Sequence, residues 1–284
     1  MIRIVEVGPR DGLQSETVSI PTDAKVAYID VLSSAGLPEI EAGAFVSPKW
    51  VPQLADSEEV FRRIRRAPGV TYSALVPNEQ GLDRALAARV DKIAVFTAAS
   101  ETFNRKNINA SIDESIARFE PVIRRARAAR IPIRGYVSTA FWCPFEGRIA
   151  PSKAVEVCRR LVDAGVDELS IGDTIGKAVP DEVKQLLEAL LPSTPPRTIA
   201  LHFHDTYGHA VENALAGWRM GIEAFDSSAG GIGGCPYAPG ASGNVATEAL
   251  VEAFRAAGAE VPGDLGALAA ARKVIAPALG RSVR

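Results

Sequence analysis

Short apolar runs alternate along the chain with longer stretches in which apolar residues recur at helical spacing. A short apolar run rich in β-branched residues predicts a strand that is buried on both faces. Eight such strands are expected, at residues 2–7, 39–45, 70–76, 92–97, 133–139, 168–172, 199–204 and 224–228. The amphipathic stretches predict helices at residues 23–34, 57–66, 80–87, 112–129, 151–164, 180–190, 210–220 and 245–257.

Several of these helices carry start or stop signals that have a physical cause. Ser111 and Glu114 have the spacing of a capping box, in which each side chain satisfies an amide of the first helical turn. Pro151 and Pro180 stand where a helix begins and a missing N–H costs nothing. Gly165 follows another predicted helix, at a position where a left-handed residue often ends the helix.

The succession of strands and helices predicts the fold class. Eight strand–helix units of roughly 30–40 residues each indicate an α/β protein whose strands close into one (β/α)8 barrel, the TIM barrel, across residues 1–284. An open doubly wound sheet is the alternative, but its glycine-rich dinucleotide fingerprint is absent from the sequence. The alanine-rich segment at about 263–284 is expected to form an additional C-terminal helix.

Composition and charge argue against nucleic acids and membranes as partners. The 284 residues are 47% hydrophobic and 23% charged, and a net charge of −2 offers no basic excess for a nucleic-acid backbone. No apolar run approaches the roughly 18 residues of a membrane span, and no targeting segment is recognised, so no membrane association is expected. Three cysteines, Cys143, Cys158 and Cys235, cannot all pair, which favours a reducing, cytoplasmic compartment.

All three histidines lie within one eight-residue window, at positions 202, 204 and 209. Since side chains alternate along a strand, His202 and His204 point to the same side at the end of a predicted strand, where a barrel carries its active site. Two imidazoles there could hold a divalent cation together with an oxygen ligand. They could equally be two hydrogen-bonded interior histidines. His209 is expected to be exposed or to cap a helix.

Charged residues also follow other predicted strands. Arg10 and Asp11 stand in a bend bracketed by glycine and proline, where Asp11 could ligate a cation and Arg10 could neutralise an oxyanion. The alternative is a surface ion pair. Glu41 lies in an apolar run and is expected to pair with an arginine such as Arg10, because an unpaired buried carboxylate is costly. Asp173 could be an acid, a base or a supporting group.

Residues 230–244 contain six glycines and follow the eighth predicted strand, so a mobile flap is expected over the mouth of the barrel. Cys235 in this flap is well placed for reactivity. Asn244 could cap the next helix or offer a neutral oxygen ligand. Trp50 and Trp218 are expected to serve packing. Together these residues predict an enzyme site with a divalent metal at one rim of the barrel.

Six motifs resemble the 3-hydroxy-3-methylglutaryl-CoA (HMG-CoA) lyase family over about residues 5–248. They are VEVGPRDGLQ (5–14), FVSPKWVPQ (45–53), NINAS (107–111), GDTIG (172–176), HFHDTYG (202–208) and GGCPYAPGASGN (233–244). The resemblance implies cleavage of (S)-HMG-CoA to acetyl-CoA and acetoacetate with Mg²⁺ or Mn²⁺. It also implies a homodimer, with leucine degradation as the usual setting.

The resemblance further implies roles for individual residues. The metal ligands would be Asp11, His202, His204 and Asn244. The catalytic residues would be Arg10, Cys235, His202, Asp173 and Glu41, and the residues that bind substrate would be Arg10, Glu248 and Asn107. Arg10 would stabilise the thioester enolate and Cys235 would act from the flap, while His202 or Asp173 would serve as the base.

One departure and two rival functions stay open at this stage. Phe141 and Trp142 precede Cys143 where small residues are usual in the family, which raises the possibility of a longer 3-hydroxyacylglutaryl-CoA substrate. A Claisen-type condensing synthase is the nearest rival, but its usual C-terminal domain does not fit into the 36 residues after Glu248. A non-catalytic acyl-CoA-binding barrel is the other.

Overall fold

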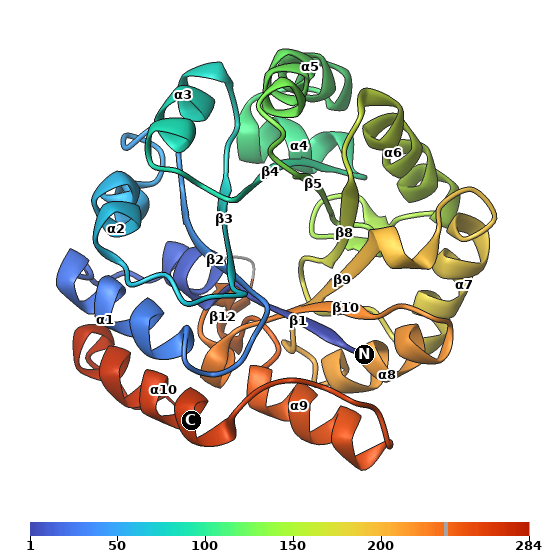
Figure 1. Ribbon diagram of the computed structural model, residues 1–284. Coiled ribbons are helices and arrows are strands. Elements are labelled where there is room, and N and C mark those ends of the chain that lie inside the picture. Colours follow the sequence, from blue (N-terminus) through green and yellow to red (C-terminus); the bar gives the residue numbers. More distant parts are fainter. Residues whose placement is uncertain (236–237, 284) are drawn as a thin grey trace.

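The strands form a closed barrel of eight parallel strands ringed by helices (Figure 1). The computed structural model describes residues 1–235 and 238–283, without the side chains of residue 235 and residues 238–242. Around the barrel, hydrogen-bonded neighbours follow the order β1-β10-β9-β8-β5-β4-β3-β2. Their bounds are β1 Arg3–Glu6, β2 Glu39–Ala44, β3 Thr71–Leu75, β4 Lys92–Ala98, β5 Ile133–Ser138, β8 Glu168–Asp173, β9 Ile199–Phe203 and β10 Ala224–Ser227.

Helices cover the outside of the barrel, with an apolar layer between them and the strands. The expected helices are α1 Thr22–Leu32, α2 Ser57–Arg63, α3 Glu79–Ala87, α5 Ile112–Ala128, α6 Pro151–Ala164, α7 Pro180–Leu190, α8 Ala210–Arg219 and α9 Thr247–Ala256. The predicted C-terminal helix is α10 (Leu265–Leu279), which packs against α1 (Figure 1). The predicted barrel and its added helix are confirmed, with bounds that differ by three residues at most for the sixteen strands and helices of the barrel.

The start and stop signals act as predicted. The Ser111 hydroxyl accepts from the Glu114 amide at 3.0 Å, and the Glu114 carboxylate accepts from the Ser111 amide at 2.6 Å. Gly165 ends α6 with φ 104°. In the part of the chain that the structure describes, no helix is long and apolar enough to cross a membrane.

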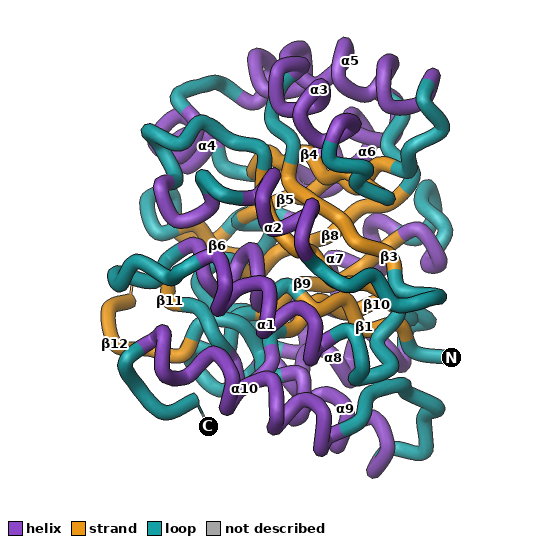
Figure 2. The backbone as a smooth tube through the Cα atoms, turned by 60° about the vertical axis from the view of Figure 1, so that its left-hand side comes forward, coloured by secondary structure: helices purple, strands orange, loops and turns teal. Residues whose placement is uncertain are grey.

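Among the described residues, one helix and two small strand pairs were not predicted. Helix α4 (Glu101–Ile108) is short and largely polar, so it lacks the apolar stripe that reveals a helix. Two small antiparallel pairs extend from the barrel, β6 (Trp142–Cys143) with β7 (Gly147–Arg148), and β11 (Gly234–Cys235) with β12 (Ala238–Ser242). Figure 2 shows β6, β11 and β12 at the end of the barrel opposite the N-terminus. They rim the mouth, where the strands end.

At its amino-terminal end the barrel interior is filled by ions instead of the usual branched apolar side chains. Arg3 of β1 and Glu168 of β8 pair at 2.8 Å although their strands are not neighbours, so this contact crosses the inside of the barrel. Lys92 bridges Glu39 at 2.9 Å and Glu168 at 3.0 Å. The buried Arg134 of β5 also pairs with Glu168. We call these five residues the ion cage.

Each charged side chain of the ion cage lies beside side chains of opposite charge, which offsets the cost of burying it. Burial alone would raise the pKa of Glu168, but the surrounding cations, Arg134 foremost, outweigh that effect and lower the pKa from 4.5 to about 2. A carboxylate whose pKa falls on folding stabilises the fold above its unfolded pKa, and that contribution is lost as pH falls through the folded pKa. The ion cage should therefore hold the barrel together at neutral pH and release it in acid.

Glu168→Gln tests this contribution. The substitution leaves the cations of the ion cage with one carboxylate fewer, and we expect it to lower the free energy of unfolding at pH 7 by about 3 kcal/mol. The loss should shrink as pH falls from about 4.5 toward 2, where Glu168 of the wild type is itself protonated. Urea unfolding of both proteins at several pH values measures it.

Glu59→Gln is the control, because it removes a surface carboxylate that pairs with Arg62 and should leave stability near that of the wild type. A difference between Glu168→Gln and wild type that is the same at pH 7 and at pH 2 would contradict the electrostatic account.

Candidate active site at the mouth of the barrel

A single π-helical turn, Gly8–Gly12, carries the first two candidate residues to the mouth of the barrel. The Val7 carbonyl accepts from the amides of Arg10, Asp11 and Gly12 at 2.8–3.2 Å, which fixes the turn directly after β1. Glycine is required at position 8, because a Cβ there would lie 2.5 Å from a carboxylate oxygen of Glu6. The turn therefore presents Arg10 and Asp11 inward with little freedom.

Asp11, His202 and His204 form the centre of the site. Each offers one ligand atom, and these atoms lie within 4.8 Å of one another. The Nε2 atoms of both histidines lie 3.9 Å from Oδ2 of Asp11, and each histidine is 8% exposed. The prediction that both imidazoles face the same side at the mouth is confirmed. We call these three residues the ligand cluster, since a carboxylate and two imidazoles at this spacing can hold a divalent cation.

Asp226 of β10, which the sequence analysis missed, orients the first imidazole. Its Oδ2 lies 3.2 Å from Nδ1 of His202 and accepts from the Ser170 hydroxyl at 2.7 Å, while its Oδ1 accepts from Arg134 at 2.7 Å. Burial would raise the pKa of Asp226, but the Arg134 charge and these hydrogen bonds outweigh burial and hold it well below its usual range. An ionised Asp226 keeps the proton on Nδ1 of His202 and leaves Nε2 free to bind a metal.

Asn244 lies against the ligand cluster. It forms an isolated antiparallel bridge with His204, and its Nδ2 donates to Asp11 at 3.0 Å and to the Ile232 carbonyl at 3.2 Å. Its side-chain oxygen is buried and accepts no hydrogen bond among the described residues. Asn244 is not a helix cap, because α9 begins three residues later at Thr247. A buried amide oxygen without a donor is the kind of group that a cation would satisfy.

Arg10 is held by a fixed set of acceptors. Its Nε and Nη2 both lie 2.7 Å from the same oxygen of Glu41, and its Nη1 lies 2.6 Å from Asp11. The Tyr136 hydroxyl donates to that Glu41 oxygen at 3.1 Å, and the Arg10 guanidinium lies over the Tyr136 ring. The expected pairing of Glu41 with Arg10 is confirmed, and the guanidinium is buried with its plane fixed.

The same contacts set the charge of the two carboxylates in opposite ways. Burial would raise the pKa of Asp11, but Arg10 and the two histidines hold it well below its usual range. Burial does raise the pKa of Glu41, although Arg10 partly offsets the effect. Asp11 is therefore the anion available to a cation, while Glu41 serves as the acceptor that anchors Arg10.

Asp173 is fully buried at the end of β8 and shapes the loop that follows. Its carboxylate oxygens accept from the amides of Lys177 at 3.1 Å and Ala178 at 2.9 Å. Burial raises its pKa to about 6, with the two backbone amides and His204 opposing the shift. Asp173 therefore combines a supporting structural role with a pKa close to neutrality.

Two predicted residues stand apart from the ligand cluster, and the side chain of a third is not described. Glu248 of α9 accepts from the Gly230 amide at 2.8 Å and pairs with Arg272 of α10 at 2.9 Å, so it anchors the start of the glycine-rich loop. Asn107 is exposed on α4, and no hydrogen bond or ion pair in residues 1–235 and 238–283 joins it to the cluster. Cys235 lies in β11 and its side chain is outside the described residues.

The aromatic side chains at 141–142 make their contacts outside the ligand cluster. Phe141 packs against Phe203, with 6.3 Å between ring centroids, and Phe203 points to the side of β9 opposite His202 and His204. Trp142 donates to Glu182 of α7 at 3.0 Å. The idea that these two rings select a longer acyl chain therefore loses its structural basis.

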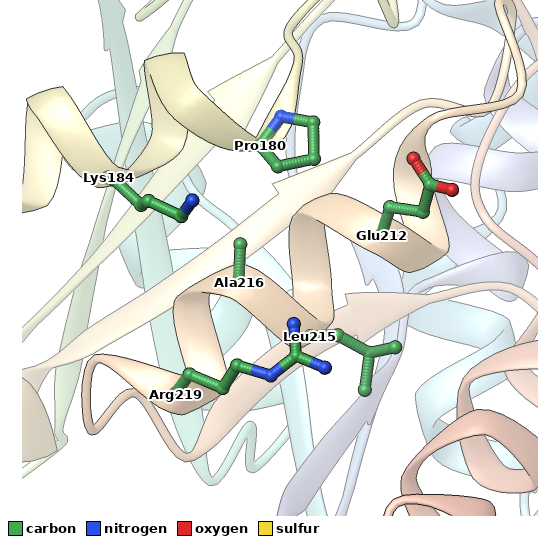
Figure 3. Close-up of a pocket in the computed structure, with 6 residues that line it drawn as sticks. All are labelled: Pro180, Lys184, Glu212, Leu215, Ala216 and Arg219. Atoms are coloured by element: carbon green, nitrogen blue, oxygen red, sulfur yellow. The ribbon is translucent and has the colours of Figure 1, made fainter.

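Two other features do not belong to the ligand cluster. Trp50 is 82% exposed, so the expectation that it serves packing was wrong. A groove of about 320 Å³ between α7 and α8 is lined by Pro180, Lys184, Glu212, Leu215, Ala216 and Arg219 (Figure 3). None of these six belongs to the ligand cluster, so the groove is not the candidate site.

Comparison with known proteins shows the family of the chain. The HMGL-like family model matches residues 1–275. The hydroxymethylglutaryl-CoA lyase, mitochondrial, of Bos taurus is 51% identical over 280 residues, which cover 99% of this chain and 86% of the relative. The 3-hydroxy-3-methylglutaryl-CoA lyase, cytoplasmic, of Rattus norvegicus is 51% identical over 281 residues, covering 99% of this chain and 82% of the relative.

Solved structures give the same result. The hydroxymethylglutaryl-CoA lyase of Pseudomonas aeruginosa superposes with a TM-score of 0.97 at 48% identity and covers 99% of this chain and 94% of the other. An HMG-CoA lyase of Acinetobacter baumannii, in complex with coenzyme A and 3-methylmalate, superposes with a TM-score of 0.94 at 38% identity. The superposition covers 100% of this chain and 92% of that one.

The role of Asp226 can be tested by substitution. Asp226→Asn removes the charge that fixes the His202 ring, and we expect the affinity for Mn²⁺, used as a probe cation, to fall about 10–100-fold. Isothermal titration calorimetry measures this affinity, and circular dichroism checks the fold. Ser170→Ala is the matched control, because it deletes one hydrogen bond to Asp226 and leaves the His202 contact in place. Equal Mn²⁺ affinity in Asp226→Asn and wild type would refute the orienting role.

Proposed function

The chain belongs to the HMGL-like family and, within it, to the HMG-CoA lyases, and on that premise we propose that it cleaves (S)-HMG-CoA to acetyl-CoA and acetoacetate. The activity is that of a carbon–carbon lyase. Relatives of this activity match almost the full chain, and this observation carries the proposal. The residues that could perform the reaction, Arg10 and the ligand cluster, meet at the mouth of the barrel.

We propose that Asp11, His202 and His204 hold Mg²⁺ or Mn²⁺, with Asn244 offering its partnerless oxygen. One carboxylate, two imidazoles and one amide oxygen leave positions for two substrate oxygens on an octahedral cation. When bound, the cation would polarise the substrate hydroxyl and lower its pKa. Asp226 supports this set, since its contact with Nδ1 of His202 orients the ring with Nε2 toward Asp11.

The cleavage needs a base at the tertiary hydroxyl and an acid at C2. We assign the base to Asp173 or His202. Asp173 is the simpler choice, because Nε2 of His202 cannot both bind a cation and take a proton. As the hydroxyl loses its proton, C3 becomes the ketone of acetoacetate. The C2–C3 bond breaks, and its electron pair forms the enolate of the acetyl thioester.

Arg10 would stabilise that enolate through its fixed donor fork. We propose that the Cys235 thiol then protonates C2, since a thiol with an ordinary pKa of about 8.5 carries its proton at neutral pH. Glu41 would keep the Arg10 plane in place and Glu248 would anchor the loop. Asn107 is proposed to contact the coenzyme A part of the substrate from the exposed rim.

The wider setting is also a proposal. A homodimer in the cytoplasm that serves leucine degradation is consistent with the family, although relatives carry both mitochondrial and cytoplasmic names. A coenzyme A thioester as the partner molecule is supported by the Acinetobacter baumannii complex with coenzyme A.

The activity and its metal requirement can be tested together. Wild-type protein stripped with a chelator should release acetoacetate from (S)-HMG-CoA only after Mg²⁺ or Mn²⁺ is restored. His204→Ala removes one ligand at the mouth, so the fold should persist while the metal concentration for half-maximal activity rises at least tenfold.

His209→Ala is the matched control, because His209 precedes α8 and lies outside the ligand cluster. A wild type without lyase activity would reject the proposed function. Full activity of chelated His204→Ala would reject the metal assignment alone.

Arg10→Lys tests the enolate role. Lysine keeps the charge but cannot reach both Glu41 and Asp11 as the planar fork does, and the enolate exists only once the bond is breaking. We therefore expect kcat to fall by roughly 100-fold or more, which corresponds to about 3 kcal/mol, with a small change in KM. Steady-state kinetics decide it, and an unchanged kcat with a raised KM would mean that Arg10 serves binding instead.

A further inference from the structure

Glu6, the last residue of β1, is a buried carboxylate that none of the proposed chemistry uses. It is 0% exposed. One oxygen accepts from the amides of Gly8 at 2.9 Å and Ala229 at 3.0 Å, and the other accepts from the Thr247 hydroxyl at 2.7 Å. Three donors from three separate segments of the chain therefore converge on one side chain.

Each of these segments leads to part of the candidate site. Gly8 opens the turn that carries Arg10 and Asp11. Ala229 begins the glycine-rich loop that leads to Cys235. Thr247 opens α9, three residues after Asn244. The turn and the two ends of the loop are thus joined through Glu6.

Within residues 1–235 and 238–283, no hydrogen bond or ion pair joins Glu6 to a cation that would explain a carboxylate at this place. The ionisable groups that face Glu6 are Tyr28 of α1 and Glu248 of α9, and neither is a cation. Burial raises the pKa of Glu6 to about 7, and the Thr247 hydroxyl and the two amides oppose the shift. An apolar residue would fill the same volume without the cost of burying a carboxylate, so what Glu6 contributes is an acceptor for the three donors.

We propose that Glu6 is a positioning residue that fastens the Arg10–Asp11 turn to both ends of the glycine-rich loop. Asp11 and Asn244 lie outside the barrel strands, and their 3.0 Å contact depends on how the turn and the loop are placed relative to each other. Glu6 sets that placement. Its importance for activity rests on the proposed function, whereas the fastening itself does not.

Two substitutions separate fastening from packing. Glu6→Leu keeps an apolar volume but leaves the amides of Gly8 and Ala229 without an acceptor. Glu6→Gln keeps an acceptor oxygen for both amides, and its NH₂ group can donate to the Thr247 hydroxyl, which in turn can donate to Ser227. The glutamine variant should therefore rescue what the leucine variant loses.

Hydrogen exchange measured by mass spectrometry gives the direct readout. In Glu6→Leu, peptides covering residues 5–13 and 228–234 should exchange at least tenfold faster than in wild type, while peptides of β4 and β5 stay within twofold. The Kd for Mn²⁺ should rise at least tenfold, and kcat should fall at least tenfold at saturating Mn²⁺. Glu6→Gln should stay within threefold of wild type in all three measurements.

Tyr72→Phe is the matched control for a lost buried polar group. It deletes a hydroxyl in the barrel wall that accepts from the Ala67 amide at 2.9 Å and donates to Ser33 at 2.8 Å. This variant should lower thermal stability with no selective loosening of either peptide and no change in Mn²⁺ affinity. If Glu6→Leu does not fold, Thr247→Val removes one of the three bonds and should loosen both peptides more weakly.

Exchange that rises evenly along the chain in Glu6→Leu, as in the control, would overturn the proposal. So would wild-type exchange at both peptides in Glu6→Leu or Thr247→Val. Selective loosening in a protein whose wild type binds no Mn²⁺ and cleaves no HMG-CoA would support the fastening and reject the proposed function.

Discussion

Arg134 connects the two ends of the barrel interior, and its charge favours the ionised forms of Glu168, Asp226 and Glu41. One side of its guanidinium pairs with Glu168 in the ion cage. The other side donates to Asp226 at 2.7 Å and to the Tyr136 hydroxyl at 3.3 Å. From Asp226 the chain of contacts continues to His202, and from Tyr136 it continues to Glu41 and Arg10.

This arrangement solves an energetic problem that an apolar barrel core does not have. Each buried ion costs several kcal/mol in desolvation, and that cost is offset only where opposite charges with good hydrogen-bond geometry surround it. Here cations and anions alternate from the ion cage to the mouth, so each ion has partners on both sides. A single neutral substitution in the series leaves two neighbours uncompensated, which couples the stability of the closed end to the geometry of the open end.

Much of the fold and half of the site could be predicted from the sequence, for a definite physical reason. Strands buried on both faces leave apolar runs, and alternation along a strand placed His202 and His204 side by side. The sequence does not single out Asp226 or Glu6, because each is one polar residue inside a short apolar run. The hydrogen-bond partners of both residues come from distant segments of the chain. The shared signal is an acid in an otherwise apolar strand, and it applies to Glu6 and Asp226 as it does to Glu41.

The backbone of the residues at the mouth is held in two different ways. The histidines sit on or directly after β9, whose neighbours β8 and β10 hold it by parallel strand pairing on both sides. Arg10 and Asp11 lie on a π-helical turn, and Asn244 lies on a loop end that an isolated bridge joins to His204, so fewer backbone bonds hold these three residues than hold the histidines. Their placement therefore depends on side chains that capture free backbone amides, as Glu6 does at Gly8 and Ala229 and Glu248 does at Gly230. Support by a few hydrogen bonds lets a segment move at lower cost than breaking a sheet would. The same bonds favour one arrangement of the turn and the loop end, and such a preorganised arrangement is what charge development on a thioester oxygen requires.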